Sequence, residues 1–255
     1  MKLYFKLNIR VKYDFRKKRG GKQVALMQLN YSDPLLDNQT TLRIILPDQI
    51  KGPLQSLYVL HGLGDDGSAW QRKTNLEALL TDYQVAAIMP SLPRSWYQNV
   101  SGGRAYFDYL TNLPQYLERL LPLSPDSRDH FIIGNSMGGY GTLKWSAYQP
   151  DFFHAVAAIS PVVDLDLVSE IMPDYRLIFS EPESLTKAQL DLKKLPVPTY
   201  WTIGEEDFLW EQNQQVLKKL ANDPKLTFQA AKGAHDWQFW NQVLPDVLDW
   251  LPLKK

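Results

Sequence analysis

From about residue 24 onward, short apolar segments alternate with longer segments whose apolar residues recur at helical spacing. Several short segments are apolar without a break, as in Leu57-Tyr58-Val59-Leu60, which is typical of strands that are covered on both faces. Because strands joined through helices run parallel to one another, the alternation predicts an α/β fold with a mostly parallel central sheet and helices on both faces. We expect strands at 24–31, 41–46, 56–60, 84–89, 131–133, 155–159, 199–203 and 227–230.

Helical patterns fall between these strands, at about 70–81, 104–120, 137–148, 208–221 and 236–251. The first helix has the signature of a capping box, in which Ser68 and Gln71 each satisfy an amide at the helix start. The stretch at about 161–196 departs from the alternation, because it is acidic and contains four prolines. We interpret it as a short insertion above the sheet, within one domain that spans 24–255.

Residues 1–23 form a basic N-terminal extension. Residues 1–22 carry nine basic side chains and a single acid, so their net charge is +8. Their apolar residues alternate with charged ones, which predicts an extra edge strand and fits no secretory signal. A start codon assigned too early explains the extension equally simply, and a basic arm that binds lipid or nucleic acid is the third alternative. We draw no functional conclusion from it.

The overall composition excludes several classes of protein. The chain has 28 Lys and Arg against 28 Asp and Glu, so no net field attracts nucleic acid or an anionic membrane. It has no cysteine, which removes disulfides, thiolate metal sites and cysteine nucleophiles. A helix needs roughly 18–20 apolar residues to span a membrane, and no apolar run in the chain is that long. With no signal and no cysteine, we expect a cytoplasmic protein with no nucleic-acid or membrane partner.

The strongest local signal is a serine between an apolar strand and a helix. Residues 131–141 contain Gly-x-Ser-x-Gly, with Ser136 at the expected strand-to-helix turn. Such a turn strains the backbone and brings strand and helix close, so it needs small residues such as Gly134 and Gly138 on either side. An ordinary glycine-rich turn would leave the same bare pattern. In its context the motif predicts that Ser136 is a nucleophile.

A serine nucleophile needs a base, normally a histidine that a carboxylate orients. His235 follows the last expected strand, which places it at the same sheet edge as Ser136. His61 also follows a strand, whereas His130 and His154 stand at strand starts, where a structural role is expected. His235 is therefore the candidate base.

Three consecutive acids, Glu205-Glu206-Asp207, follow the strand expected at 199–203. Of these, Asp207 is the candidate carboxylate, and it completes the chain order Ser, Asp, His that hydrolases of this architecture use. Glu205 and Glu206 are rivals for this carboxylate, and Asp164 is a more distant one.

The loop after the third expected strand reads His61-Gly62-Leu63-Gly64. It is placed to supply one backbone amide of an oxyanion hole, from Leu63, while Met137 would supply the other. Residues 62–67 also match the Gly-x-Gly-x-x-Gly dinucleotide pattern. Asp65 and Asp66 would stand beside a pyrophosphate, however, and no acid follows the next strand to bind a ribose. We therefore expect neither a nucleotide cofactor nor a metal.

These residues together resemble the esterase D-like α/β-hydrolases, and most of all the tributyrin esterases, short-chain carboxylesterases of lactic acid bacteria and streptococci. The likeness runs from about Val24 to the C-terminus. It rests on His61-Gly62-Leu63, Ser95-Trp96-Tyr97-Gln98-Asn99, Tyr106-Phe107-Asp108-Tyr109-Leu110, Gly134-Asn135-Ser136-Met137-Gly138-Gly139-Tyr140-Gly141, Gly204-Glu205-Glu206-Asp207-Phe208 and Gly233-Ala234-His235-Asp236-Trp237. The resemblance implies the α/β-hydrolase fold, the roles assigned above and hydrolysis of small acyl esters without a cofactor, and it allows a homo-oligomer.

Four aromatic residues are candidates for the walls of the acyl or alcohol pocket, or else ordinary core residues: Trp70, Trp96, Tyr97 and Trp237. Two other activities stay open on the same triad. S-formylglutathione hydrolases are similar but usually carry Thr-Cys where this chain has Gly64-Asp65, and an acyltransferase would share the acyl-enzyme. A non-catalytic binding protein is disfavoured, because all three triad residue types occur in order and in context.

Overall fold

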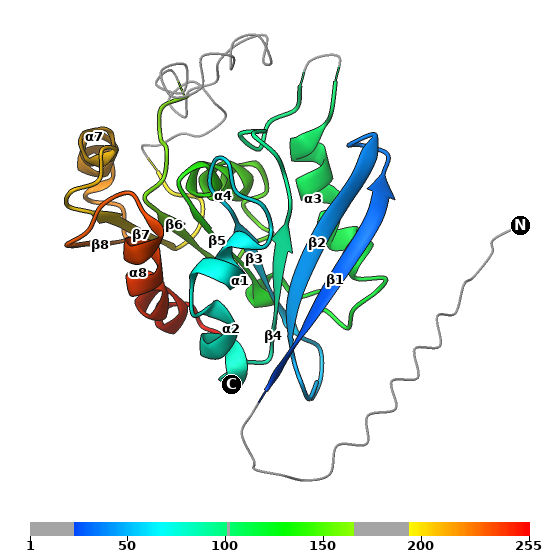
Figure 1. Cartoon of the computed structure of the whole chain (residues 1–255). Helices are drawn as coiled ribbons and strands as arrows, with labels where there is room; N and C mark the ends of the chain where they lie inside the picture. Colours follow the sequence, from blue (N-terminus) through cyan, green and yellow to red (C-terminus); the bar gives the residue numbers. More distant parts are fainter. Residues whose placement is uncertain (1–22, 101–102, 166–193) are drawn as a thin grey trace, which may run out of the picture.

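In the computed structural model, which describes residues 23–100, 103–165 and 194–255, the chain folds around one eight-stranded sheet (Figure 1). The strands lie in the order β1-β2-β4-β3-β5-β6-β7-β8. The first two pair antiparallel and β2 pairs antiparallel with β4, while every later pairing is parallel. Their bounds are β1 Val24–Asp33, β2 Asn38–Pro47, β3 Gln55–Leu60, β4 Val85–Pro90, β5 His130–Asn135, β6 Ala155–Ile159, β7 Thr199–Gly204 and β8 Leu226–Ala231.

Helices cover both faces of the sheet, which confirms the predicted α/β-hydrolase architecture. One face packs against α1 (Ala69–Lys73), α2 (Leu76–Leu79) and α8 (Trp237–Trp250), and the other against α3 (Tyr106–Leu117), α4 (Met137–Tyr148) and α7 (Trp210–Leu220). Two single 3₁₀ turns, η1 (Leu80–Asp82) and η2 (Ser127–Asp129), complete the described elements. Each of the eight expected strands corresponds to an observed one.

The central strands are buried on both faces because their side chains alternate between two apolar layers. Along β3, Leu57 and Val59 face the layer under α8, while Tyr58 and Leu60 face the layer under α4. This explains why these segments show no polar alternation in the sequence. The second buried layer also includes stacked and edge-on aromatic rings, such as Tyr58 against Trp145 at 5.0 Å.

The first expected helix differs from its prediction. The 70–81 segment is divided into α1, α2 and η1, because Thr74 takes an extended conformation and its hydroxyl bonds back to the Trp70 carbonyl. The expected capping box is wrong as well. Ser68 makes no capping bond, and its hydroxyl instead bonds to Asp66 and accepts from Arg72 Nε.

The last residues of the chain join the amino ends of three central strands. The Lys254 amide donates to Gln55 Oε1 at the start of β3, and its carbonyl accepts from the Gln84 amide just before β4. The Lys254 ammonium lies 2.6 Å from Asp129 Oδ1, beside the start of β5. The end opposite the carboxyl edge of the sheet is therefore tied together by a residue almost 200 positions away in sequence.

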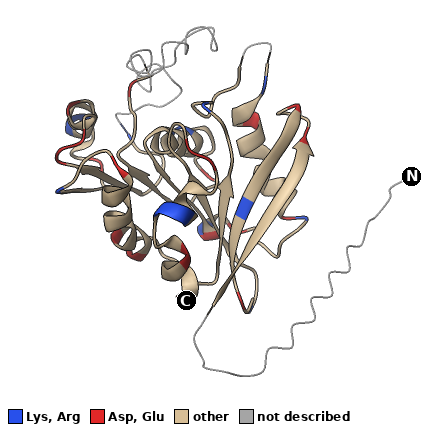
Figure 2. Ribbon diagram, in the orientation of Figure 1, with Lys and Arg blue, Asp and Glu red and all other residues tan. Residues whose placement is uncertain are grey.

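Two predicted segments, the extension and most of the insertion at 161–196, lie outside the described residues, so their assignment stays a prediction. Basic and acidic residues are interspersed along the described ribbon (Figure 2). In the described part of the chain, no helix combines the length and the apolar character needed to cross a membrane.

Candidate active site

Ser136 stands between β5 and α4, in the strained turn that the sequence predicts. Its φ is 54°, in the region that residues other than glycine rarely adopt. The close approach of strand and helix explains the flanking glycines. A Cβ added at Gly134 would lie 2.3 Å from the Gly138 carbonyl oxygen, and one added at Gly138 would lie 2.3 Å from the Leu60 carbonyl oxygen. No larger residue fits at either position without moving the backbone.

Ser136, His235 and Asp207 come together at the carboxyl edge of the sheet. His235 Nε2 lies 2.9 Å from Ser136 Oγ, and its Nδ1 lies 2.9 and 3.0 Å from the two carboxylate oxygens of Asp207. Because a carboxylate only accepts hydrogen bonds, Nδ1 carries the proton and Nε2 accepts from the serine hydroxyl. This arrangement can draw a proton from Ser136 and hold the resulting imidazolium.

The structure also distinguishes Asp207 from its rivals. The Asp207 side chain is fully buried and accepts a further bond from the Leu209 amide, whereas Glu205 and Glu206 are exposed. No bond joins His235 to either glutamate or to Asp164 within the described residues. Of the three consecutive acids in the turn after β7, only Asp207 is therefore buried and in contact with His235.

The two predicted oxyanion amides border Ser136. Met137 begins α4, so its amide is one of those that a helix cannot satisfy internally. Leu63 follows Gly62, whose added Cβ would lie 3.5 Å from Ser136 Cβ, and the Leu63 amide donates to no acceptor in the described chain. Their role as donors to an oxyanion that develops beside the serine stays a prediction.

The four aromatic candidates differ in their surroundings. Trp70, Trp96 and Tyr97 are at most 1% exposed, so they can line a substrate pocket only where that pocket extends into the core. Trp237 is half-buried, and its indole N–H donates to Asp65 at 3.2 Å. Their contact with a substrate stays a prediction.

Phe208 is a further candidate for substrate contact that the sequence patterns do not single out. Phe208 is 66% exposed, the largest fraction among the large apolar side chains described, and its ring centroid lies 4.6 Å from that of His235. Trp240 covers the same imidazole from the buried side, at 5.1 Å. An exposed aromatic ring beside the candidate base is placed to meet an incoming ligand. Its position directly after Asp207 was the available signal.

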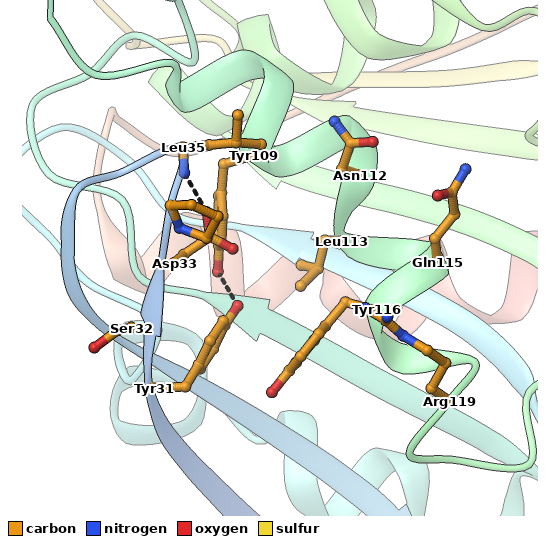
Figure 3. A pocket seen from close by; sticks show the side chains of 11 residues that line it. Tyr31, Ser32, Asp33, Leu35, Tyr109, Asn112, Leu113, Gln115, Tyr116 and Arg119 are labelled. Carbon is orange, nitrogen blue, oxygen red and sulfur yellow. Dashed lines mark hydrogen bonds between the residues drawn. The ribbon is translucent and has the colours of Figure 1, made fainter. Parts of the chain in front are cut away.

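A separate hollow of about 400 Å³ lies between the end of β1 and α3 (Figure 3). Its tyrosines pair closely: the Tyr31 and Tyr109 hydroxyls are 2.8 Å apart, and the Tyr31 ring stacks on Tyr116 at 4.8 Å. Burial raises the pKa of Tyr109 to about 12, so its phenol is neutral near pH 7. The hollow includes neither Ser136 nor His235.

Comparison with known proteins gives concordant results. The family model described as Esterase, putative esterase, matches residues 34–251. An acetyl esterase of Caldicellulosiruptor saccharolyticus is 26% identical over 89% of this chain and 98% of its own length. A fluorophosphonate-binding serine hydrolase of Staphylococcus aureus, FphF, is 28% identical with a TM-score of 0.80, over 90% of this chain and 98% of that one. An S-formylglutathione hydrolase of the same species, FrmB, is also 28% identical with a TM-score of 0.79, over 90% of this chain and 99% of that one.

Proposed function

The chain belongs to the putative esterase family, and from that premise we propose that it is a serine carboxylesterase that hydrolyses short-chain acyl esters through Ser136, His235 and Asp207. One observation carries the proposal. A serine at a strained strand-to-helix turn lies 2.9 Å from a histidine nitrogen, and the other nitrogen of that ring lies 2.9 Å from a buried carboxylate. The short-chain preference is supported by the resemblance to tributyrin esterases and by the similarity to an acetyl esterase.

In the first half of the reaction, Ser136 Oγ attacks the ester carbonyl carbon while His235 Nε2 takes the hydroxyl proton. The carbonyl oxygen becomes an oxyanion, which the amides of Leu63 and Met137 stabilise. The Asp207 carboxylate accepts a hydrogen bond from the protonated imidazole and stabilises its positive charge. The tetrahedral species then collapses, the bond to the alcohol oxygen breaks, and His235 returns the proton to the departing alcohol.

In the second half, water takes the place of the alcohol. His235 removes a proton from the water as its oxygen attacks the acyl carbon, and the same two amides receive the second oxyanion. Collapse breaks the bond to Ser136, which recovers its proton from His235 and releases the carboxylic acid. No redox or metal step is needed to balance the reaction.

The proposal is tested by initial rates on p-nitrophenyl acetate, butyrate, octanoate and palmitate, with Ser136→Ala beside the wild type. We expect the acetate and butyrate to be the fast substrates. Removing the nucleophile should reduce turnover by about 10⁴-fold or more. A folded Ser136→Ala protein that keeps over about a tenth of the rate would exclude Ser136 as nucleophile. Equal rates across all four chain lengths would contradict the short-chain preference.

A second candidate activity is hydrolysis of the thioester S-formylglutathione, which the similarity to FrmB favours. The same triad would serve, with a thiol as the leaving group. Adding S-formylglutathione to the panel distinguishes the two: a kcat/KM for the thioester well above that for every oxygen ester would replace our first proposal. Product analysis with a competing alcohol would reveal an acyltransferase.

A further inference from the structure

We propose that His61 is a positioning residue for the oxyanion hole: its imidazole holds the Gly62 carbonyl so that the Leu63 amide faces the reacting centre. The inference rests on the proposed function, because it concerns how that site is kept in order. His61 lies outside the Ser136, His235 and Asp207 relay, and its side chain is completely buried. It nevertheless bonds to the loop that carries Gly62 and to the loop that follows β4.

The hydrogen bonds of His61 determine its tautomer. Nδ1 lies 2.9 Å from the Gly62 carbonyl oxygen, and Nε2 lies 3.1 Å from the Leu92 amide nitrogen. A carbonyl only accepts and an amide N–H only donates, so Nδ1 carries the proton and Nε2 is bare. Burial lowers the pKa of His61, which keeps the ring neutral and this tautomer in place.

The bond to Gly62 orients the amide that follows it. The carbonyl of Gly62 and the N–H of Leu63 belong to one planar trans peptide, and they point to opposite sides of it. The Gly62 oxygen also accepts from the Asp65 amide at 3.3 Å, which closes a turn. With the carbonyl held from one side by His61 and Asp65, the Leu63 N–H is directed away from them. Any rotation of this peptide would move the oxyanion donor.

Tyr97 holds the preceding peptide in the same way. Its hydroxyl donates to the His61 carbonyl at 2.8 Å, and burial raises its pKa, so it stays protonated. Its ring packs against α4, where a Cβ added at Gly141 would approach it to 2.6 Å. Two successive peptides, those after His61 and after Gly62, are therefore each held by a buried side chain. The prediction that Tyr97 lines the pocket stays a prediction, and its hydroxyl in addition braces the loop that carries Leu63.

His61 could instead serve only to tie two loops together through Leu92, and two substitutions separate these roles. Asparagine places an amide nitrogen near the position of Nδ1, so His61→Asn can still donate to Gly62 but cannot reach Leu92. Glutamine extends to the position of Nε2, so His61→Gln can still accept from Leu92 but has no donor for Gly62. Each variant therefore removes one of the two hydrogen bonds of the His61 ring and keeps the other.

The experiment measures kcat and KM on p-nitrophenyl butyrate, and the rate at which a fluorophosphonate labels Ser136. The phosphoryl oxygen of that probe takes the place of the ester carbonyl oxygen. Because loss of one oxyanion donor costs about 10²–10³-fold in kcat, a misdirected donor in His61→Gln should cost about 10–100-fold. We expect KM to change less than about threefold, labelling to slow in parallel, and His61→Asn to be at least about fivefold faster than His61→Gln.

His61→Asn as slow as His61→Gln, or slower, would overturn the inference, since the tie to Leu92 would then be what matters. Full activity of His61→Gln would also overturn it. Circular dichroism shows whether both variants are folded. If they are not, the 15N chemical shifts of the imidazoles in the wild-type protein replace them: a proton on His61 Nε2 and not on Nδ1 would overturn the inference, because the Gly62 carbonyl would then have no donor from the ring. A wild-type protein that the probe does not label would instead contradict the proposed function itself.

Discussion

The active site draws its two halves from different parts of the sheet. The nucleophile half lies at the ends of β3 and β5, which are paired neighbours in the middle of the sheet, with Leu60 opposite Gly134. Apart from the Ser136 hydroxyl, it would act through backbone amides. The base half lies in the loops after β7 and β8, which form the outer end of the sheet. There the side chains of Asp207 and His235 would take part in the proposed reaction.

The two halves therefore differ in the changes they tolerate. In the nucleophile half, the nearest neighbours of Gly134 and Gly138 are backbone atoms, so added volume must displace a strand or a helix. In the base half, the exposed side chains of Glu205, Glu206 and Phe208 leave room for change. Its glycines do not, because a Cβ added at Gly204 would lie 2.2 Å from the Gly233 carbonyl oxygen. We therefore expect both halves to be sensitive to added volume at these glycines, and the base half to depend in addition on the charge and hydrogen bonding of its side chains. Three experiments test this difference.

The largest effect is expected in the base half, from a change that preserves shape. Asp207→Asn keeps the volume but removes the charge that holds the imidazolium and its tautomer, so kcat should fall by about 10³–10⁴-fold. The matched control is Glu206→Gln, which makes the same chemical change at the neighbouring exposed position. Steady-state rates on p-nitrophenyl butyrate provide the comparison. If Glu206→Gln is the more damaging of the two, the carboxylate is misassigned.

A smaller effect is expected in the nucleophile half, from the addition of one methyl group. Gly138→Ala places a carbon 2.3 Å from the Leu60 carbonyl oxygen, so α4 must move away from β3. We expect a loss of about 1–3 kcal/mol in the free energy of unfolding. The displaced serine should lower kcat by about 10²-fold.

The control for that change is Gly52→Ala, because a Cβ at Gly52 would meet nothing within 4 Å. Denaturant unfolding and steady-state rates are measured for both variants. Wild-type stability in Gly138→Ala would show that strand and helix can separate at little cost, and that added volume does not limit the nucleophile half.

The smallest effect is expected at the rim of the base half. If a bound alkyl group covers about 40 Å² of the Phe208 ring, the contact is worth about 1 kcal/mol, so Phe208→Ala should raise KM about fivefold. The control is Phe228→Ala, which removes a 39% exposed ring on β8. KM is compared on p-nitrophenyl acetate and butyrate. An unchanged KM with a lowered kcat would show that Phe208 acts on His235 and not on the substrate.

Much of the architecture could be predicted because its determinants are local. Continuous apolar runs mark the buried strands, and the Gly-x-Ser-x-Gly spacing marks the one turn where a helix begins against a strand. The structure brings Ser136, Asp207 and His235 together in the predicted order, and their catalytic roles stay predictions. Asp207 could be preferred over Glu205 and Glu206 from chain order, but the sequence leaves both as rivals, because the physical choice depends on which side chain the turn after β7 buries.

The remaining differences arise from tertiary contacts. The capping box at Ser68 fails because Asp66 and Arg72 compete for the hydroxyl. Trp96 and Tyr97 both have positive φ and point into the core, which no pattern of residue types indicates. The role proposed for His61 depends on which backbone groups reach its two nitrogens, and that is visible only in three dimensions.

The bonds made by Lys254 have a consequence for biosynthesis. Because Lys254 joins the starts of β3, β4 and β5, the bonds that it adds between these strands can form only after the ribosome has passed residue 254. A domain normally folds as a unit during or after synthesis. Here β3 and β4, which are buried on both faces, are covered by α8 only near the end of synthesis. Chaperone binding to the nascent chain is therefore favoured during this interval.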